Sequence, residues 1–117
     1  MPPDRNKNIY LQDIFKAVSK IIVLTEGMDF RRFSKDERTV DAVLYNFAII
    51  GEAARHTPET TRQAYPDIPW MDMQDMRNLV IHEYFGVDLQ IVWKTIKDDL
   101  PPLLDMFMHA LKKFAPC

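Results

Sequence analysis

Apolar residues return every three or four positions along most of this chain, and this spacing limits the possible folds more than any other feature. The first periodic stretch runs from Asn8 to about Glu26 and ends near Gly27. Only 3 glycines occur among 117 residues, and the 8 prolines cluster at the apparent ends of the periodic stretches. The pattern predicts an all-α fold, an up-and-down bundle of four to five main helices in a single domain over residues 1–117.

Capping signals set the expected ends of the next two helices. Ser34 to Glu37 has the spacing of a capping box, so a second long helix is expected to begin there, after a loop that starts at Met28. This helix is expected to stop before Pro58. Thr57 is then expected to cap a short helix that has Pro58 in its first position and reaches about Ala64.

Three further helices are predicted in the second half of the chain. The third main helix is expected from Trp70 to about Tyr84. Asp88 is a good N-cap for the helix after it. Pro101–Pro102 marks a boundary before the last helix, whose apolar residues are Leu103, Leu104, Phe107, Ala110, Leu111 and Phe114.

Charge and cysteine content restrict the setting in which this protein works. A formal net charge of −2 and a pI near 5.9 argue against a broad basic surface, so any contact with nucleic acid must be local. The single cysteine, Cys117, suits a reducing compartment. The chain has neither a signal-like N-terminus nor an apolar run of about 18 residues, so we expect a cytoplasmic protein with no membrane contact.

The segment around residues 77–84 concentrates groups that suit chemistry. Arg77 offers a fixed positive charge, His82 can transfer protons near neutral pH, and Tyr84 has a hydroxyl that can be modified. On a regular helix, Tyr84 lies within about 20° of Arg77, but His82 lies about 140° away from Arg77. Either the helix loosens near Phe85–Gly86, or a second copy of the chain completes the site. Asn78, four residues before His82, is a candidate for fixing the imidazole tautomer.

The second long helix carries another candidate residue, Glu52. A glycine inside a helix costs about 1 kcal/mol relative to alanine, so Gly51 indicates close packing against a neighbouring helix. Glu52 stands beside this glycine, and two interpretations of it remain open. It pairs with Arg55 or His56 at helical spacing, or it supports the site of Arg77 and His82.

The sequence contains neither a metal-binding motif nor a phosphate-binding loop motif. His82–Glu83 begins like a zinc-protease helix, but the position of the second histidine is Gly86. His56, His109 and Cys117 do not have metal-ligand spacing, and the glycines are too dispersed for a phosphate-binding loop. We expect neither a metal nor a cofactor.

Several motifs together resemble the HEPN superfamily, and within it the HepT-like branch. Arg77 is followed after four residues by His82 and then, after one more, by Tyr84. The accompanying segments occur in the order found in that branch: Ile49–Ala54, Ile68–Trp70, Met76–Asn78, His82–Phe85 and Val92–Pro101. The resemblance implies an all-helical, dimeric HEPN-like bundle with two copies of the motif near a two-fold axis, forming a cleft for RNA.

The resemblance also implies roles for the motif residues. Active members cut RNA without a metal, so His82 would move protons during attack of a ribose 2′-hydroxyl, and Arg77 would stabilise charge on the phosphate. The chain would be the toxin of a type VII-like MNT/HepT toxin–antitoxin pair. Its antitoxin, an MNT-type nucleotidyltransferase, would silence it by AMPylation of Tyr84. Four arginines are candidate RNA contacts: Arg31, Arg32, Arg55 and Arg77.

Two other hypotheses stay open at this point. The chain could be a noncatalytic helical subunit that binds a nucleotidyltransferase or a nucleotide, which predicts co-purification without RNA cleavage. It could also be a purely structural dimerisation bundle. Retained partner binding and cell toxicity after Arg77→Ala would favour that last hypothesis.

Overall fold

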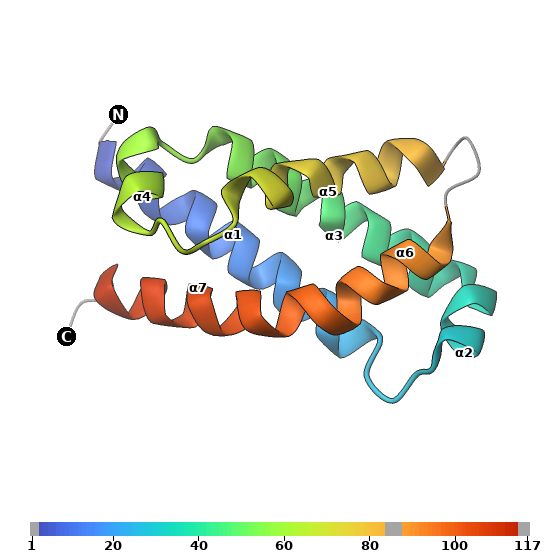
Figure 1. Cartoon of the computed structure of the whole chain (residues 1–117). Helices are drawn as coiled ribbons and strands as arrows, with labels where there is room; N and C mark the ends of the chain where they lie inside the picture. The colour runs from blue at the N-terminus through green and yellow to red at the C-terminus, as the bar shows by residue number, and fades with distance from the viewer. Residues whose placement is uncertain (1–2, 84–87, 115–117) are drawn as a thin grey trace.

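In the computed structural model, which describes residues 3–83 and 88–114, four long helical segments run up and down alongside one another (Figure 1). Side chains are described for residues 9–78 and 88–112. The elements in chain order are α1 (Pro3–Leu24), α2 (Phe30–Lys35), α3 (Glu37–His56), α4 (Glu59–Ala64), α5 (Trp70–Glu83), α6 (Leu89–Lys94), the π-helical turn η1 (Thr95–Asp99) and α7 (Leu100–Phe114). These described segments contain no strand, which confirms the predicted all-α class.

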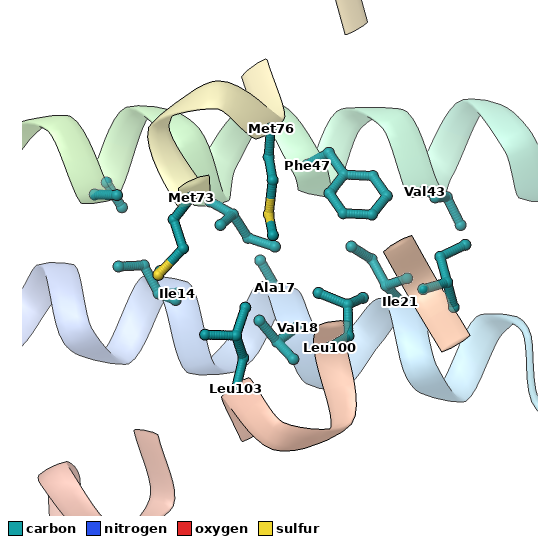
Figure 2. Packing of buried hydrophobic residues seen from close by; sticks show 14 of the residues in the cluster. Ile14, Ala17, Val18, Ile21, Val43, Phe47, Met73, Met76, Leu100 and Leu103 are labelled. Atoms are coloured by element: carbon teal, nitrogen blue, oxygen red, sulfur yellow. The ribbon is translucent and has the colours of Figure 1, made fainter. Parts of the chain in front are cut away.

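The long helices bury their apolar stripes against one another. Helix α1 packs against α3 and α7, and α3 packs against α5. Figure 2 shows the resulting core, in which side chains from α1, α3, α5 and α7 meet. Leu11, Ile14, Val18 and Ile21 of α1 are fully buried, as their spacing predicted. Each such side chain contributes about 1.5–3 kcal/mol of hydrophobic free energy. In the part of the chain that the structure describes, no helix has both the length and the apolar character needed to cross a bilayer.

The predicted capping box at Ser34 is wrong. The segment expected to be a loop contains α2, which is capped by Asp29 through a 2.8 Å bond from the Arg32 amide. Ser34 lies inside α2, and its hydroxyl donates to the Arg31 carbonyl. The second long helix is capped by Asp36, whose carboxylate accepts from the Thr39 amide at 3.1 Å. The error arose because serine and aspartate two residues apart both have an acceptor at capping distance.

The predicted N-cap at Thr57 is also wrong, although the short helix is present. Thr57 is the C-cap of α3, and its buried hydroxyl donates to the Ala53 carbonyl at 2.8 Å. Pro58 is the N-cap of α4 and makes no side-chain capping bond. The Thr57 hydroxyl was expected to accept a hydrogen bond from an amide of α4. It instead donates to a carbonyl in the last turn of α3.

Pro101–Pro102 does not separate two helices as predicted. The chain stays helical from α6 through η1 into α7, and both exposed prolines lie in the first turn of α7. In the π-helical turn before them, the Leu100 amide donates to the Thr95 carbonyl five residues earlier. A proline inside an α-helix lacks an amide and clashes with the preceding turn, and a widened turn relieves this conflict. The prolines therefore mark a local defect within one long segment.

Candidate functional site

Helix α5 has one face in the core and another at the surface. Met73 and Met76 are buried, whereas Arg77 and Asn78 are exposed. The start of the helix is fixed by Trp70, which is buried and donates its indole N–H to the Tyr65 carbonyl at 3.1 Å. Because its apolar face is held by the core, α5 presents Arg77 from a defined position.

Gly51 sets how closely α3 and α5 approach. A Cβ atom at Gly51 would lie 2.9 Å from the Arg77 Cβ, 3.0 Å from the Arg77 amide nitrogen and 3.2 Å from the Gln74 carbonyl oxygen. Any larger residue would therefore press on the backbone of α5. The predicted close packing at Gly51 is confirmed, and the helix that it contacts carries the candidate arginine.

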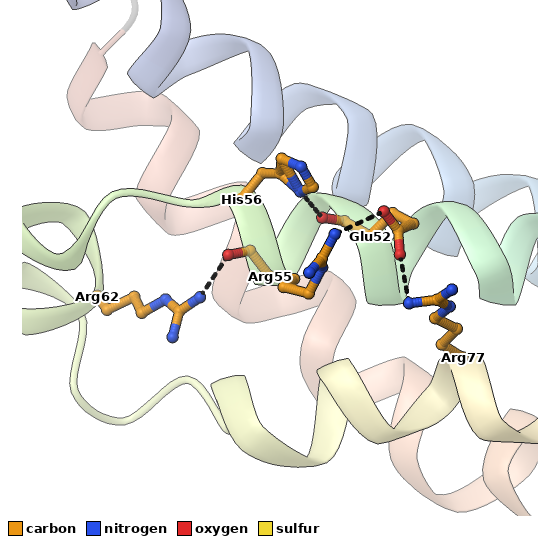
Figure 3. A network of polar contacts seen from close by, with 5 residues as sticks. All are labelled: Glu52, Arg55, His56, Arg62 and Arg77. Atoms are coloured by element: carbon orange, nitrogen blue, oxygen red, sulfur yellow. Dashed lines mark hydrogen bonds and ion pairs between the residues drawn. The ribbon is translucent and has the colours of Figure 1, made fainter.

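Glu52, the next residue on α3, forms an ion pair with Arg77. Its Oε1 lies 3.0 Å from Arg77 Nη1, and its Oε2 lies 3.7 Å from Arg55 Nη2 (Figure 3). Both interpretations of Glu52 thus describe part of the geometry, since it contacts a cation on its own helix and one on α5. His56 contributes differently, because its Nδ1 lies 3.0 Å from the Glu52 backbone carbonyl.

The arrangement leaves positive charge available to a ligand. The side chains of Arg77 and Glu52 are 50% and 43% exposed, while Oε1 of Glu52 is itself covered. One carboxylate faces two guanidinium groups, so the cluster of Glu52, Arg55 and Arg77 carries a formal charge of about +1. The carboxylate orients Arg77 through one nitrogen, and the planar guanidinium keeps further N–H donors that suit a phosphate.

The other two motif residues are only partly covered by the structure. His82 belongs to α5, which continues as an α-helix to Glu83, but its side chain is outside the described residues. Tyr84 also lies outside the described residues. The helix does not loosen between Arg77 and His82, so their backbone positions differ by about 140° around the helix axis. The predicted role of Asn78 toward His82 stays a prediction.

Arg62 is a positioning residue that the sequence did not reveal. From α4 it donates to the carbonyls of Ala54 at 2.8 Å, Arg55 at 2.9 Å and Thr57 at 3.2 Å, and so caps the C-terminus of α3. When the Gln74 amide is oriented to suit its neighbours, its oxygen accepts from Arg62 Nη1 at 3.1 Å. Arg62 therefore connects the end of α3 to α5. Nothing in the local sequence distinguishes it from a surface arginine.

The structure does not bring all the candidate arginines together. Arg31 and Arg32 lie on α2, beside the first turn of α3, whereas Arg55 lies in the last turn of α3. Arg55 lies 18 residues after the first residue of α3, which corresponds to roughly 27 Å along the helix. Arg31 and Arg32 instead line a separate cavity with Lys35. The local positive site near Glu52 thus comprises Arg55 and Arg77.

A cavity of about 410 Å³ beside α5 and α7 has the opposite charge. Four aspartates contribute to its lining: Asp67, Asp72, Asp75 and Asp99. These carboxylates repel phosphate, which makes this cavity a poor position for the RNA backbone. Among the described residues, no group of three or more histidine, cysteine, aspartate or glutamate side chains is arranged to hold a metal ion.

The structure is a small helical domain in which Glu52 pairs with Arg55 of α3 and Arg77 of α5, and comparison with known proteins places it in a family. Residues 14–110 match the model of the ribonuclease HepT-like family. The chain therefore belongs to the ribonuclease HepT-like family, which confirms both the resemblance found in the sequence and the expected class of enzyme.

Similar proteins span nearly the whole chain. A protein of Thermococcus cleftensis named "Probable ribonuclease HepT" is 41% identical over 103 residues, covering 88% of this chain and 94% of the relative. A "Putative RNase" of Methanocaldococcus jannaschii is 34% identical over 99 residues, covering 85% and 91%. Another, from Caldanaerobacter subterraneus subsp. tengcongensis, is 35% identical over 104 residues, covering 89% and 93%. No solved structure matches the chain significantly.

Proposed function

We propose that this protein is a metal-independent endoribonuclease and the toxin of an MNT/HepT toxin–antitoxin pair in the cytoplasm. The observation that carries the proposal is the ion pair between Glu52 and Arg77, at 3.0 Å. Arg77 lies on α5, the helix that also contains His82. A carboxylate that holds an exposed arginine in place prepares it to receive a phosphate without prior reorganisation. Membership of a ribonuclease family supports RNA as the source of that phosphate.

The reaction follows from the properties of the two side chains. Neutral His82 takes the proton from a ribose 2′-hydroxyl, and the resulting oxygen attacks the adjacent phosphorus. The bond from phosphorus to the 5′-oxygen breaks, and the imidazole that took the 2′-hydroxyl proton gives this proton to the leaving oxygen. Arg77 stabilises the extra negative charge on the phosphoryl oxygens as the bond changes occur. The products are a 2′,3′-cyclic phosphate and a free 5′-hydroxyl, so atoms and charges balance without a metal.

A homodimer brings the imidazole of one protomer to the arginine of its partner. Arg77 and His82 occupy backbone positions about 140° apart on α5, so one regular helix does not aim both at a single point. In a two-fold dimer, the arginine of one protomer and the histidine of its partner converge on one phosphodiester. Asn78 then orients the imidazole of His82 from four residues earlier.

Regulation acts through Tyr84. In this proposal the partner nucleotidyltransferase transfers AMP to the Tyr84 hydroxyl and releases pyrophosphate from ATP. Each AMP adds a base and a negatively charged phosphate beside Arg77, where it excludes RNA by bulk and by repulsion. Intact mass after co-expression with an MNT-type nucleotidyltransferase tests this step. We expect a gain of one or more AMP units, absent from Tyr84→Phe, and an unmodified wild-type chain would contradict it.

The nuclease itself is tested without its partner. The purified protein is incubated with tRNA or mRNA in EDTA, beside His82→Ala, and the product ends are mapped. We expect cyclic phosphate ends from the wild type and none from His82→Ala. Equal cleavage by both proteins, or no cleavage by either, would overturn the proposal. Stable co-purification with a nucleotidyltransferase and no cleavage would instead favour a noncatalytic binding subunit.

A further inference from the structure

A small cavity opens between α1 and α3, next to the ion pair of Glu52 and Arg77. Its volume is about 290 Å³, and it is lined by Tyr10, Asp13, Ile49, Glu52, Ala53 and His56. Glu52 belongs to both features, since it lines the cavity and also binds Arg77. In Figure 3, Glu52 stands between His56 on its own helix and Arg77 on the facing helix. The cavity and the candidate site therefore share Glu52.

The walls of the cavity suit a flat aromatic ligand. Two of the lining residues, Tyr10 and His56, are aromatic, and their ring centroids lie 6.0 Å apart with the planes tilted by 41°. His56 is held by the contact of its Nδ1 with the Glu52 carbonyl, at 3.0 Å, and this leaves Nε2 for a ligand. Ile49 and Ala53 add apolar surface. Proteins that read single-stranded RNA stack unpaired bases on aromatic side chains of this kind.

Asp13 gives the cavity a selective polar group. It is exposed, and no hydrogen bond or ion pair joins its carboxylate to another side chain in the described ranges 9–78 and 88–112. A carboxylate has two acceptor oxygens and no donor. Guanine has two adjacent donors on its Watson–Crick edge, the N1–H and the N2 amino group, whereas each of the other bases has an acceptor beside its donor. The Asp13 carboxylate, which has no partner within the described ranges, therefore favours guanine.

We propose that this cavity is a nucleobase subsite that selects guanine next to the cleaved phosphodiester. The proposal rests on the ribonuclease function proposed above. With a phosphate on Arg77, the adjacent base enters between α1 and α3, stacks on Tyr10 and His56, and donates two hydrogen bonds to Asp13. The +1 charge of the arginine cluster holds the backbone, and the cavity supplies the sequence preference.

Cleavage of defined RNAs tests the subsite. The substrates are four oligonucleotides that differ only in the base next to the cleaved bond, and kcat/KM is measured for each. We expect the wild type to prefer guanine at least about fivefold, as one bidentate contact provides, and Asp13→Asn to lose the preference while it still cuts the other substrates. Asp41→Asn makes the same charge change at an exposed position of α3 away from the cavity, and it should leave the preference intact.

Binding separates this proposal from the nuclease proposal. Titration with GMP and AMP, followed by calorimetry, requires no cleavage. Tighter binding of GMP that is lost in Asp13→Asn supports the subsite even for a chain that cuts no RNA. Equal binding of the two nucleotides, or equal cleavage of the four substrates, would overturn it. A third outcome would also overturn the proposal: Tyr10→Leu and Asp13→Asn change the oligomeric state but keep the preference for guanine. The cavity would then be a subunit interface.

Discussion

Gly51 and Arg77 are in such close contact that a single added methyl group would lie 2.9 Å from the arginine Cβ and 3.0 Å from its amide nitrogen. These atoms belong to the packed backbone region of α5, so they cannot move aside as the end of a flexible side chain can. The spacing between α3 and α5 therefore depends on this glycine. That spacing also determines whether Glu52 reaches Arg77.

Gly51→Ala should impair both stability and cleavage. Overpacking costs about 1–3 kcal/mol, and the better helix propensity of alanine returns about 1 kcal/mol of this. Displacement of α5 should lower RNA cleavage by roughly tenfold or more, because small errors in position are costly in catalysis. Urea unfolding and kcat/KM measure the two effects. The matched control is Ala42→Gly on the same helix, which should lose about 1 kcal/mol and keep its activity.

Glu52→Gln should separate function from stability. The ion pair with Arg77 is about half exposed, so its loss should change the free energy of unfolding by less than about 1 kcal/mol. Cleavage should nevertheless fall roughly tenfold, since Arg77 loses the partner that orients it. Glu59→Gln, an exposed residue of α4, controls for the change in net charge. Cleavage by Glu52→Gln at the wild-type rate would show that the orientation of Arg77 does not depend on this carboxylate.

Arg62→Met should destabilise the chain more than replacement of an exposed arginine. Arg62 donates to three carbonyls at the end of α3, and charge-assisted hydrogen bonds contribute more than neutral ones. We expect a loss of about 2 kcal/mol, partly restored in Arg62→Lys, which lacks the forked donor. Arg38→Met provides the comparison. A difference between the Arg62→Met and Arg38→Met variants of less than about 0.5 kcal/mol would contradict a capping role for Arg62.

Asp36 predicts a dependence of stability on pH. Hydrogen bonds from Thr39, first from its backbone amide, hold the pKa of Asp36 below its ordinary value of 3.8. A depressed pKa in the folded state stabilises the protein above the unfolded pKa, and this contribution disappears as pH falls from 3.8 through the lowered value. Asp36→Asn keeps a capping acceptor but does not titrate. The stability that Asp36→Asn loses relative to the wild type, measured by thermal unfolding, should therefore become smaller below pH 3.8. A loss of stability that is the same at every pH would contradict the prediction.

The main helices were predictable from the sequence because burial dominates their formation. A stripe such as Leu11, Ile14, Val18 and Ile21 has one low-energy solution, in which its face lies against another helix. Helix ends were less predictable, since Ser34 and Asp36 are both residue types that cap helices and lie two positions apart before the second long helix. Such choices depend on neighbours that only the folded chain brings close.

Some candidate site residues could be identified from the sequence, and others only from the folded structure. Gly51 and Glu52 were identifiable because a mid-helix glycine beside a carboxylate departs from the apolar pattern. The ion pair to Arg77 spans 25 positions in the chain and required the packing of α3 on α5. Arg62 could not be found, because its three acceptors are backbone carbonyls that any sequence possesses. The cavity next to Tyr10 likewise exists only where α1 meets α3.

The proposed sharing of Arg77 and His82 between two protomers is tested most directly by complementation. Arg77→Ala and His82→Ala chains with different affinity tags are co-expressed, and the mixed dimer is purified through both tags. Each variant alone should have lost roughly a hundredfold or more of the cleavage rate. The mixed dimer, which pairs an intact arginine on one chain with an intact histidine on the other, should regain cleavage of RNA in EDTA well above either parent. A mixed dimer as inactive as both parents would contradict a site shared between protomers.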